Sequence, residues 1–173
     1  MVVDQNFLKV KRFTISILLL IFTTTFSLAK NLNFKRIVNL NSPWGSTFIN
    51  NDELLITEKS GKIKLINLNS EKIFEIDHNL NYLEHRQGGL LDILFKNDFV
   101  YISYTENRGN RKTSTSIAKA RFNTKKFIFR NIFQANPPID SGYHFGSRLA
   151  IKDNYLFASV GERGEGMIAQ DPS

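Results

Sequence analysis

The sequence predicts an all-β fold, a β-propeller of which the chain holds about two and a half blades. The first observation is a period of two, from residue 44 onward, in short runs rich in Ile, Phe and Tyr such as 62–68 (KIKLINL). The second is that turns carrying Asn, Asp, Ser and Gly separate these runs. The third is that the pattern recurs as a unit along the chain.

The repeated unit is an apolar strand, a turn with Asn and Asp, a second apolar strand and a terminal glutamate. It occurs as TFINNDELLITE (47–58), ILFKNDFVYISYTE (93–106) and LAIKDNYLFASVGE (149–162). The glutamates that end these units are roughly 50 residues apart, which is the spacing of four-stranded propeller blades. They are Glu58, Glu106 and Glu162.

The strands can be placed by counting through the units. We expect them near 46–50, 54–58, 62–68 and 72–77 in the first blade and near 89–95, 100–105, 115–123 and 126–134 in the second. Two strands of a third blade precede Ser173. Because a propeller closes with about 4–8 blades, we expect residues 30–173 to be the incomplete N-terminal part of a longer propeller domain.

Residues 1–29 have the three-part layout of a secretory signal peptide. A basic segment (Lys9, Lys11 and Arg12) precedes an uncharged run over 13–26, and small residues then lead to a cleavage site after Ala29. The alternatives are a membrane anchor or a buried helix, but a spanning helix needs about 20 apolar residues and this run is shorter and rich in threonine. Cleavage would leave no stable membrane anchor, and it predicts a periplasmic or secreted location in a bacterium.

The composition removes several function classes. None of the 173 residues is cysteine, which excludes disulfides, thiolate metal sites and cysteine nucleophiles. The chain carries 23 Lys and Arg against 16 Asp and Glu, but the cations are scattered among Asn, Ile and Phe instead of forming the clusters that bind nucleic acid. We therefore expect no nucleic-acid partner.

Hairpin geometry brings a histidine and a carboxylate together in the third unit. If its turn centres on Asp153, His144 lies opposite Glu162, with Cβ atoms roughly 5 Å apart. An imidazole held by a carboxylate can act as a general base near neutral pH, because the carboxylate fixes the tautomer and stabilises the imidazolium. The alternative is a structural pair that ends a strand. The histidines His78 and His85 have no partner in register and are expected to be solvated.

The same arithmetic in the other units places Glu106 opposite Gly88 and Glu58 opposite Trp44. The starts of the innermost strands, with Gln87 among them, would then converge on one mouth of the central channel. A register slip of one residue would turn such a side chain away.

The loop 161–166 (GERGEG) is rich in glycine, which suits a close approach of backbone to a ligand. It lacks the Gly-Lys-Ser/Thr ending of a P-loop. Its acidic residues and Asp171 do not have the spacing of an EF-hand, so no metal-binding residue is assigned within the chain.

Segments spread over nearly all of residues 40–171 carry a family resemblance. They are Pro43-Trp44-Gly45, LLITEKSGKIKLI (54–66), RQGGLLDILF (86–95), VYISYTE (100–106), HFGSRLAI (144–151), LFASVGERG (156–164) and Ala169-Gln170-Asp171. In this order they resemble the glucose/sorbosone dehydrogenase family, the soluble aldose sugar dehydrogenases that use pyrroloquinoline quinone. The resemblance implies a six-bladed propeller that oxidises the anomeric carbon of an aldose to a lactone, with hydride transfer to the quinone. It also implies bound calcium and an external electron acceptor.

The resemblance also implies residue roles. His144 in HFGSR matches the catalytic base, and Glu162 in GERG matches the acidic residue that supports it, usually an aspartate in relatives. Gln87 in RQGG matches a residue near the sugar and the quinone. The further residues expected to line the site are Tyr143, which replaces an aspartate of some members, Arg163 and Gln170.

Most ligands of the quinone and of calcium come from later blades in this family. The chain as written is therefore expected to be inactive by itself. The alternative function is a secreted, non-catalytic propeller module that binds sugar or protein.

Overall fold

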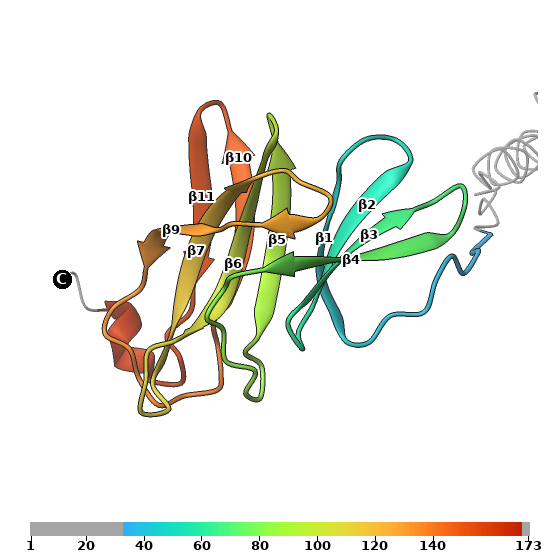
Figure 1. Cartoon of the computed structure of the whole chain (residues 1–173). Coiled ribbons are helices and arrows are strands. Elements are labelled where there is room, and N and C mark those ends of the chain that lie inside the picture. The colour runs from blue at the N-terminus through green and yellow to red at the C-terminus, as the bar shows by residue number, and fades with distance from the viewer. Residues whose placement is uncertain (1–32, 171–173) are drawn as a thin grey trace, which may run out of the picture. The chain divides into compact units, whose positions relative to one another are not determined.

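The computed structural model describes residues 33–170. The predicted signal peptide lies outside the described residues, so it stays a prediction. Within 33–170, no helix is long and apolar enough to cross a membrane. The compact unit Arg36–Ser173 carries every described strand (Figure 1).

The described residues form β-sheets and one short 3-10 helix, which confirms the predicted all-β fold. The first sheet contains β1 (Pro43–Phe48), β2 (Glu53–Glu58), β3 (Lys62–Asn67) and β4 (Lys72–His78). The second contains β5 (Leu90–Lys96), β6 (Phe99–Asn107), β7 (Thr113–Arg121) and β9 (Arg130–Gln134). A hairpin of β10 (Gly146–Lys152) and β11 (Tyr155–Val160) follows, and then the 3-10 helix η1 (Gly166–Gln170). Two antiparallel meanders and a hairpin are the predicted two and a half blades.

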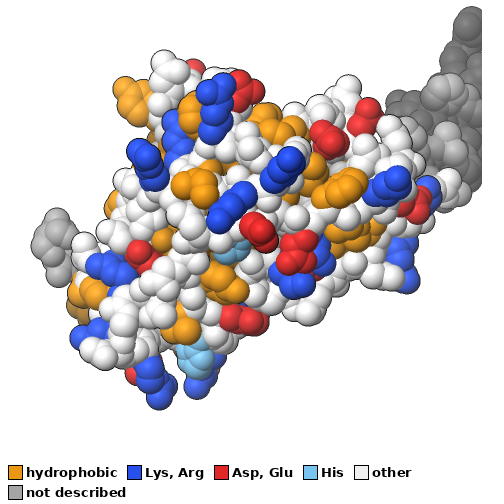
Figure 2. Space-filling view, viewed as in Figure 1, with side chains coloured by type: hydrophobic (Ala, Val, Ile, Leu, Met, Phe, Trp, Pro, Cys, Tyr) orange, Lys and Arg blue, Asp and Glu red, His pale blue; other side chains and the backbone are white. Residues whose placement is uncertain are grey.

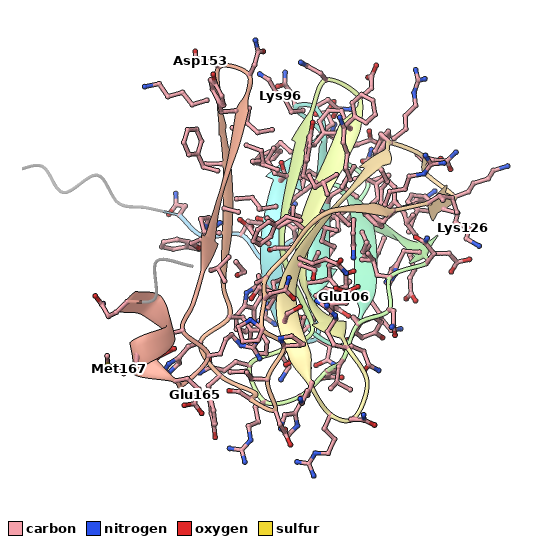
Figure 3. All side chains as sticks on the ribbon, turned by 90° about the vertical axis from the view of Figure 1, so that its left-hand side faces the viewer. Lys96, Glu106, Lys126, Asp153, Glu165 and Met167 are labelled. Carbon is pink, nitrogen blue, oxygen red and sulfur yellow. The ribbon has the colours of Figure 1, made fainter. Side chains whose placement is uncertain are left out.

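The strand expected over 126–134 is interrupted. Its first part, β8 (Lys126–Phe127), leaves the second sheet and pairs in parallel with the end of β4, through Asp77↔Lys126 and His78↔Phe127. Phe127 is fully buried there. Lys126, labelled in Figure 3, is the first residue of β8 and shows where the chain leaves the second sheet to pair with β4. Burial of the Phe127 ring between the sheets outweighs the continuation of one regular strand.

The core lies between the first and second sheets. Its buried side chains are Leu55, Ile63, Leu65, Ile76, Leu90, Ile93, Val100, Ile102, Tyr104, Ala118, Ala120, Phe127 and Phe129. Fully burying a Leu, Ile or Phe side chain contributes about 1.5–3 kcal/mol. This shared interface therefore contributes a large part of the stability of both sheets.

The first strands of the three units lie side by side. β5 contacts both β1 and β10. Gly45 packs so closely on β5 that a Cβ atom at this position would lie 2.7 Å from the Cα of Asp92. The buried Asp92 carboxylate accepts a hydrogen bond from the Leu149 N–H (2.8 Å) and contacts Arg148 Nη1 (3.3 Å). Asp92 therefore ties the second sheet to the third hairpin.

The first hairpin of each unit contains a β-bulge. The register shifts lie between Pro43 and Ser46, between Leu90 and Ile93, and between Gly146 and Leu149. A bulge adds one residue to one strand and re-aims the side chains beyond it. The repeated units therefore share this irregularity as well as their sequence pattern.

In the third hairpin the bulge restores the predicted register. Near the turn, Lys152 pairs with Tyr155, one residue away from the pairing expected for a turn centred on Asp153. Beyond the bulge, Gly146 pairs with Val160, which is the expected register. The segments that carry His144 and Glu162 are thus aligned as predicted, although the sequence pattern did not show the bulge.

Charged side chains are spread over the surface. Figure 2 shows Lys and Arg side chains interspersed with Asp, Glu and apolar side chains on the visible face. The expected lack of a nucleic-acid partner stays a prediction.

Candidate active site

The candidate site lies at the strand ends opposite the hairpin turns. In Figure 3, Lys96 and Asp153 mark the turn end of the sheets and Glu165 marks the other end. The loop before β10 and the loop after β11 meet there, because the Arg163 N–H donates to the His144 carbonyl (3.3 Å). Loops that connect strands can carry polar side chains on a scaffold whose core is already packed.

His144 and Glu162 form the central contact of the site. His144 Nδ1 lies 2.5 Å from Glu162 Oε1, and Glu162 Oε2 accepts a hydrogen bond from the Gly164 N–H (2.8 Å). Because a carboxylate only accepts, Nδ1 carries the hydrogen in this contact, and in the neutral imidazole Nε2 then has a lone pair. The Gly164 N–H first, and His144 second, lower the pKa of Glu162 below its usual value. The His144 side chain is 56% exposed, so Nε2 is open to a ligand.

The backbone around His144 is unusual. His144 has a φ of 49°, in the left-handed region that residues with a Cβ atom rarely occupy. A Cβ atom at Gly161 would lie 1.9 Å from the His144 carbonyl oxygen, so glycine is required there. Such strained positions persist where the surrounding structure holds them, and they are frequent at functional sites.

Gln87 joins this pair from the loop before β5. The side-chain Oε1 of Gln87 accepts a hydrogen bond from the backbone N–H of His144 (2.9 Å). The backbone N–H of Gln87 donates to the Gly142 carbonyl (2.9 Å). The side-chain amide thus has its oxygen on the backbone of His144, and its NH₂ group remains as a donor. The structure brings Gln87, His144 and Glu162 together, while their catalytic and binding roles stay predictions.

Tyr143 lies at the edge of the site with a partner that the sequence did not predict. The Arg86 guanidinium carbon is 4.7 Å from the centre of the Tyr143 ring, and that centre is 6.2 Å from the centre of the His144 ring. The sequence signal for Arg86 was its position directly before Gln87.

Arg163 has its contacts inside the loop cluster. Its side chain is buried, lies over the Phe145 ring (3.8 Å), and donates to the Tyr143 carbonyl (3.2 Å). Further hydrogen bonds go to the carbonyl groups of Thr113 (3.1 Å) and Ser141 (2.8 Å). Burial lowers the pKa of Arg163 to about 10. These contacts hold the loop before β10 in place, and the predicted contact of Arg163 with a ligand remains untested.

Gln170 is exposed at the end of η1. Among the described residues, no hydrogen bond joins the Gln170 side chain to His144 or to Glu162. Its role in ligand binding stays a prediction.

Glu58 does not take the position predicted for it. It pairs with Pro43 and not with Trp44, because the bulge in β1 shifts the register. Its buried carboxylate binds Lys64 Nζ (2.7 Å) and the Asn41 N–H (2.7 Å). Burial, the largest single effect, raises the pKa of Glu58, but these two hydrogen bonds and the charges of Lys64 and Lys62 together lower it below its usual value.

Glu106 also differs from the prediction. It bridges Tyr82, not Gly88, which bridges His85 in a tight turn. The Glu106 carboxylate turns into its own sheet, where it accepts hydrogen bonds from Ser116 (2.7 Å), Asn131 (2.9 Å) and Gln134 (2.7 Å).

The expectation for His78 was wrong, because this side chain is not solvated on all sides. Its Nε2 donates to the Gly61 carbonyl (2.7 Å) and its Nδ1 accepts from the Leu80 N–H (3.2 Å). His85 is exposed, as expected.

The fold and the site together define a class: a propeller-type β protein whose loop ends hold a histidine and a carboxylate with one free imidazole nitrogen. The model of the glucose/sorbosone dehydrogenase family matches residues 40–173, and the chain belongs to this family. This confirms the resemblance inferred from the sequence motifs.

Two relatives are similar over most of the chain. The aldose sugar dehydrogenase YliI of Escherichia coli (strain K12) is 30% identical over 142 residues, which are 76% of this chain and 38% of that protein. A solved structure described as glucose dehydrogenase is 30% identical, with a TM-score of 0.71 over 76% of this chain and 44% of that one. The chain thus spans less than half the length of these relatives.

A third relative shows the fold and carries a cofactor. The structure of the pyrroloquinoline-quinone-bound form of an aldose sugar dehydrogenase from Streptomyces coelicolor is 23% identical, with a TM-score of 0.67. The two chains match over 77% of this chain and 42% of that one.

Proposed function

We propose that the full-length protein is a quinoprotein aldose sugar dehydrogenase that oxidises the anomeric carbon of a sugar to a lactone. The observation that carries the proposal is the His144–Glu162 pair, with Nδ1 held by the carboxylate and Nε2 exposed. Membership of the family supports it, as does the name of the relative from Escherichia coli.

The residues of this chain would handle the proton. Nε2 of His144 accepts the proton of the anomeric hydroxyl, and the Glu162 carboxylate stabilises the imidazolium that forms. The Gln87 NH₂ group can donate to a sugar oxygen beside His144, since the amide oxygen is already bound to the His144 N–H. General base catalysis of this kind contributes roughly 10²–10⁴-fold to a rate.

The cofactor would be pyrroloquinoline quinone, which when bound supplies a hydride acceptor. The described residues fit part of such a ligand. They offer a base at Nε2 of His144 and an amide donor at Gln87. Arg163 does not add a free cation to this set, because its guanidinium already donates to the carbonyl groups of Thr113 and Ser141.

Calcium has a weaker basis. Among residues 33–170, no group of three or more His, Asp or Glu side chains is arranged to hold a metal ion. We therefore assign calcium no ligand in the described part of the chain, and its involvement remains an expectation from the family.

The location and the partners complete the proposal. We propose a periplasmic or secreted protein that passes electrons from the sugar to an external acceptor. This location depends on the signal layout of residues 1–29.

The test is a reconstitution assay on the full-length protein with quinone, calcium, an aldose and a reducible dye. The expected result is dye reduction that falls by about 10²–10⁴-fold in His144→Ala. His78→Gln is the matched control, because His78 is bonded through both ring nitrogens to backbone groups away from Glu162. A silent wild-type protein that still binds aldose would contradict the enzyme and favour the non-catalytic propeller.

A further inference from the structure

Arg86 is a cation at the edge of the site whose guanidinium forms no hydrogen bond with the described part of the chain. No described carboxylate forms an ion pair with it, although the other cations of the neighbouring loops are engaged. The carbon of its guanidinium lies 4.7 Å from the centre of the Tyr143 ring. Contact with an aromatic ring leaves the N–H donors at the edge of the guanidinium plane free for a carboxylate.

The position of Arg86 is built by its neighbours. Arg86 has a φ of 52°, and its carbonyl oxygen accepts a hydrogen bond from Lys59 Nζ (2.8 Å). A Cβ atom at Gly142 would lie 2.7 Å from Arg86 Cδ, so the absence of a side chain at Gly142 makes room for the stem of Arg86. Arg86 is thus seated between the end of the first sheet and the loop that carries His144.

This seat lies beside the reacting end of the site. Arg86 directly precedes Gln87, whose amide binds the His144 N–H. The Tyr143 ring neighbours both the guanidinium (4.7 Å) and the His144 ring (6.2 Å between centres). A ligand that bound Nε2 of His144 and also covered the Tyr143 ring would therefore come within reach of Arg86.

We propose that Arg86 is a specificity-determining residue that binds the carboxylate of an acidic aldose, so that the site prefers a uronic acid to a neutral sugar. This inference rests on the proposed function, and it adds a substrate class to it. Planar N–H pairs of arginine match the two oxygens of a carboxylate, and such charge-assisted hydrogen bonds are stronger than neutral ones.

The test measures binding by titration calorimetry on the quinone-free full-length protein, with D-glucuronate and D-glucose as probes. The wild-type protein is expected to bind glucuronate more tightly than glucose. Arg86→Gln is expected to weaken glucuronate binding by about tenfold or more and glucose binding by less than about twofold. Arg86→Lys keeps the charge but lacks the planar pair of N–H donors. Its affinity for glucuronate is expected to lie between those of the wild type and of Arg86→Gln. Thermal melting checks that each variant is folded.

Arg130→Gln is the matched control, because Arg130 is an exposed arginine on β9, the outer strand of the second sheet. It is expected to leave both affinities unchanged. Equal binding of the two sugars by the wild type would overturn the inference, while oxidation of glucose would leave the proposed function standing. If neither sugar binds or reacts, both fail.

A second arm separates the sugar from the quinone, which also carries carboxylates. Quinone binding is followed by its absorbance in the wild type and in Arg86→Gln. The inference requires that the ratio of glucuronate to glucose affinity changes in the variant. If quinone affinity falls while that ratio stays at the wild-type value, Arg86 serves the cofactor and the inference is overturned.

Discussion

Glu106 lies near the end of β6 and Glu162 lies just beyond the end of the equivalent strand β11, but they have opposite surroundings. The Glu106 side chain is 12% exposed and receives hydrogen bonds from Ser116, Asn131 and Gln134 of its own sheet. The Glu162 side chain is 27% exposed and binds His144. One carboxylate is thus a bonded part of a sheet interior, and the other holds an imidazole at the surface.

The difference comes from what lies next to each glutamate. After β6, the strands β7 and β9 supply donors to Glu106. After β11, the described chain continues into the loop that bonds with His144. A carboxylate becomes structural when neighbouring strands satisfy it, and it becomes available for chemistry when a loop supplies its partner. Position in a repeat therefore does not determine function.

The largest effect expected from this comparison is on turnover. Glu162→Gln keeps the size of the side chain but removes the charge that stabilises the imidazolium, so turnover by the reconstituted full-length protein is expected to fall by about 10²–10⁴-fold. The melting temperature is expected to change little. Steady-state kinetics and thermal melting measure the two outcomes, and a large loss of stability without a loss of turnover would reverse the comparison.

The second effect is on stability. Glu106→Ala would leave the Ser116, Asn131 and Gln134 donors without their acceptor, at a cost of about 3 kcal/mol in the free energy of unfolding. Urea denaturation of the chain would measure this change. The pH profile of turnover in the remaining folded protein is expected to match the wild type. A change in that profile would show that Glu106 reaches the site.

The smallest expected effect concerns Glu58, the glutamate that ends the first unit. It extends the comparison because its carboxylate is buried and its pKa is nevertheless lowered. A glutamate has a pKa of about 4.3 in the unfolded chain. When its pKa in the folded protein is lower, it stabilises the fold above that pH. This stabilisation is lost as the pH falls through the folded pKa. The chain should therefore lose part of its stability on acidification below about pH 4.3. In Lys64→Met, which removes the partner ammonium, acid unfolding followed by circular dichroism is expected to begin at higher pH. If the variant and the wild type begin to unfold at the same acidic pH, the Glu58–Lys64 pair does not contribute to stability.

Much of the fold was predictable because strand periodicity and turn residues are local signals. The strands β2 and β3 begin and end within a residue of their expected bounds. The bulges were not predictable, because these strands are too short for one extra residue to stand out from the alternation of their side chains. Glu58 was therefore given a wrong partner. Glu106 lacks its predicted partner for another reason, since Gly88 turns back to bridge His85.

The site was predictable where it depended on a single hairpin. His144 and Glu162 were brought together by register arithmetic within one unit. The buried position of Arg163 and the contact of Arg86 with Tyr143 depend on loops far apart in the sequence. No periodic pattern relates those loops, so composition and spacing could not reveal them.

The parallel pairing of β8 with β4 has a consequence for folding of the chain. β8 follows β5, β6 and β7 in the sequence, so the outer edge of β4 stays unpaired until this distant segment reaches it. Until Phe127 is buried, the first blade keeps an open edge and an incomplete core. We therefore expect the two blades to complete their folding together and not one after the other.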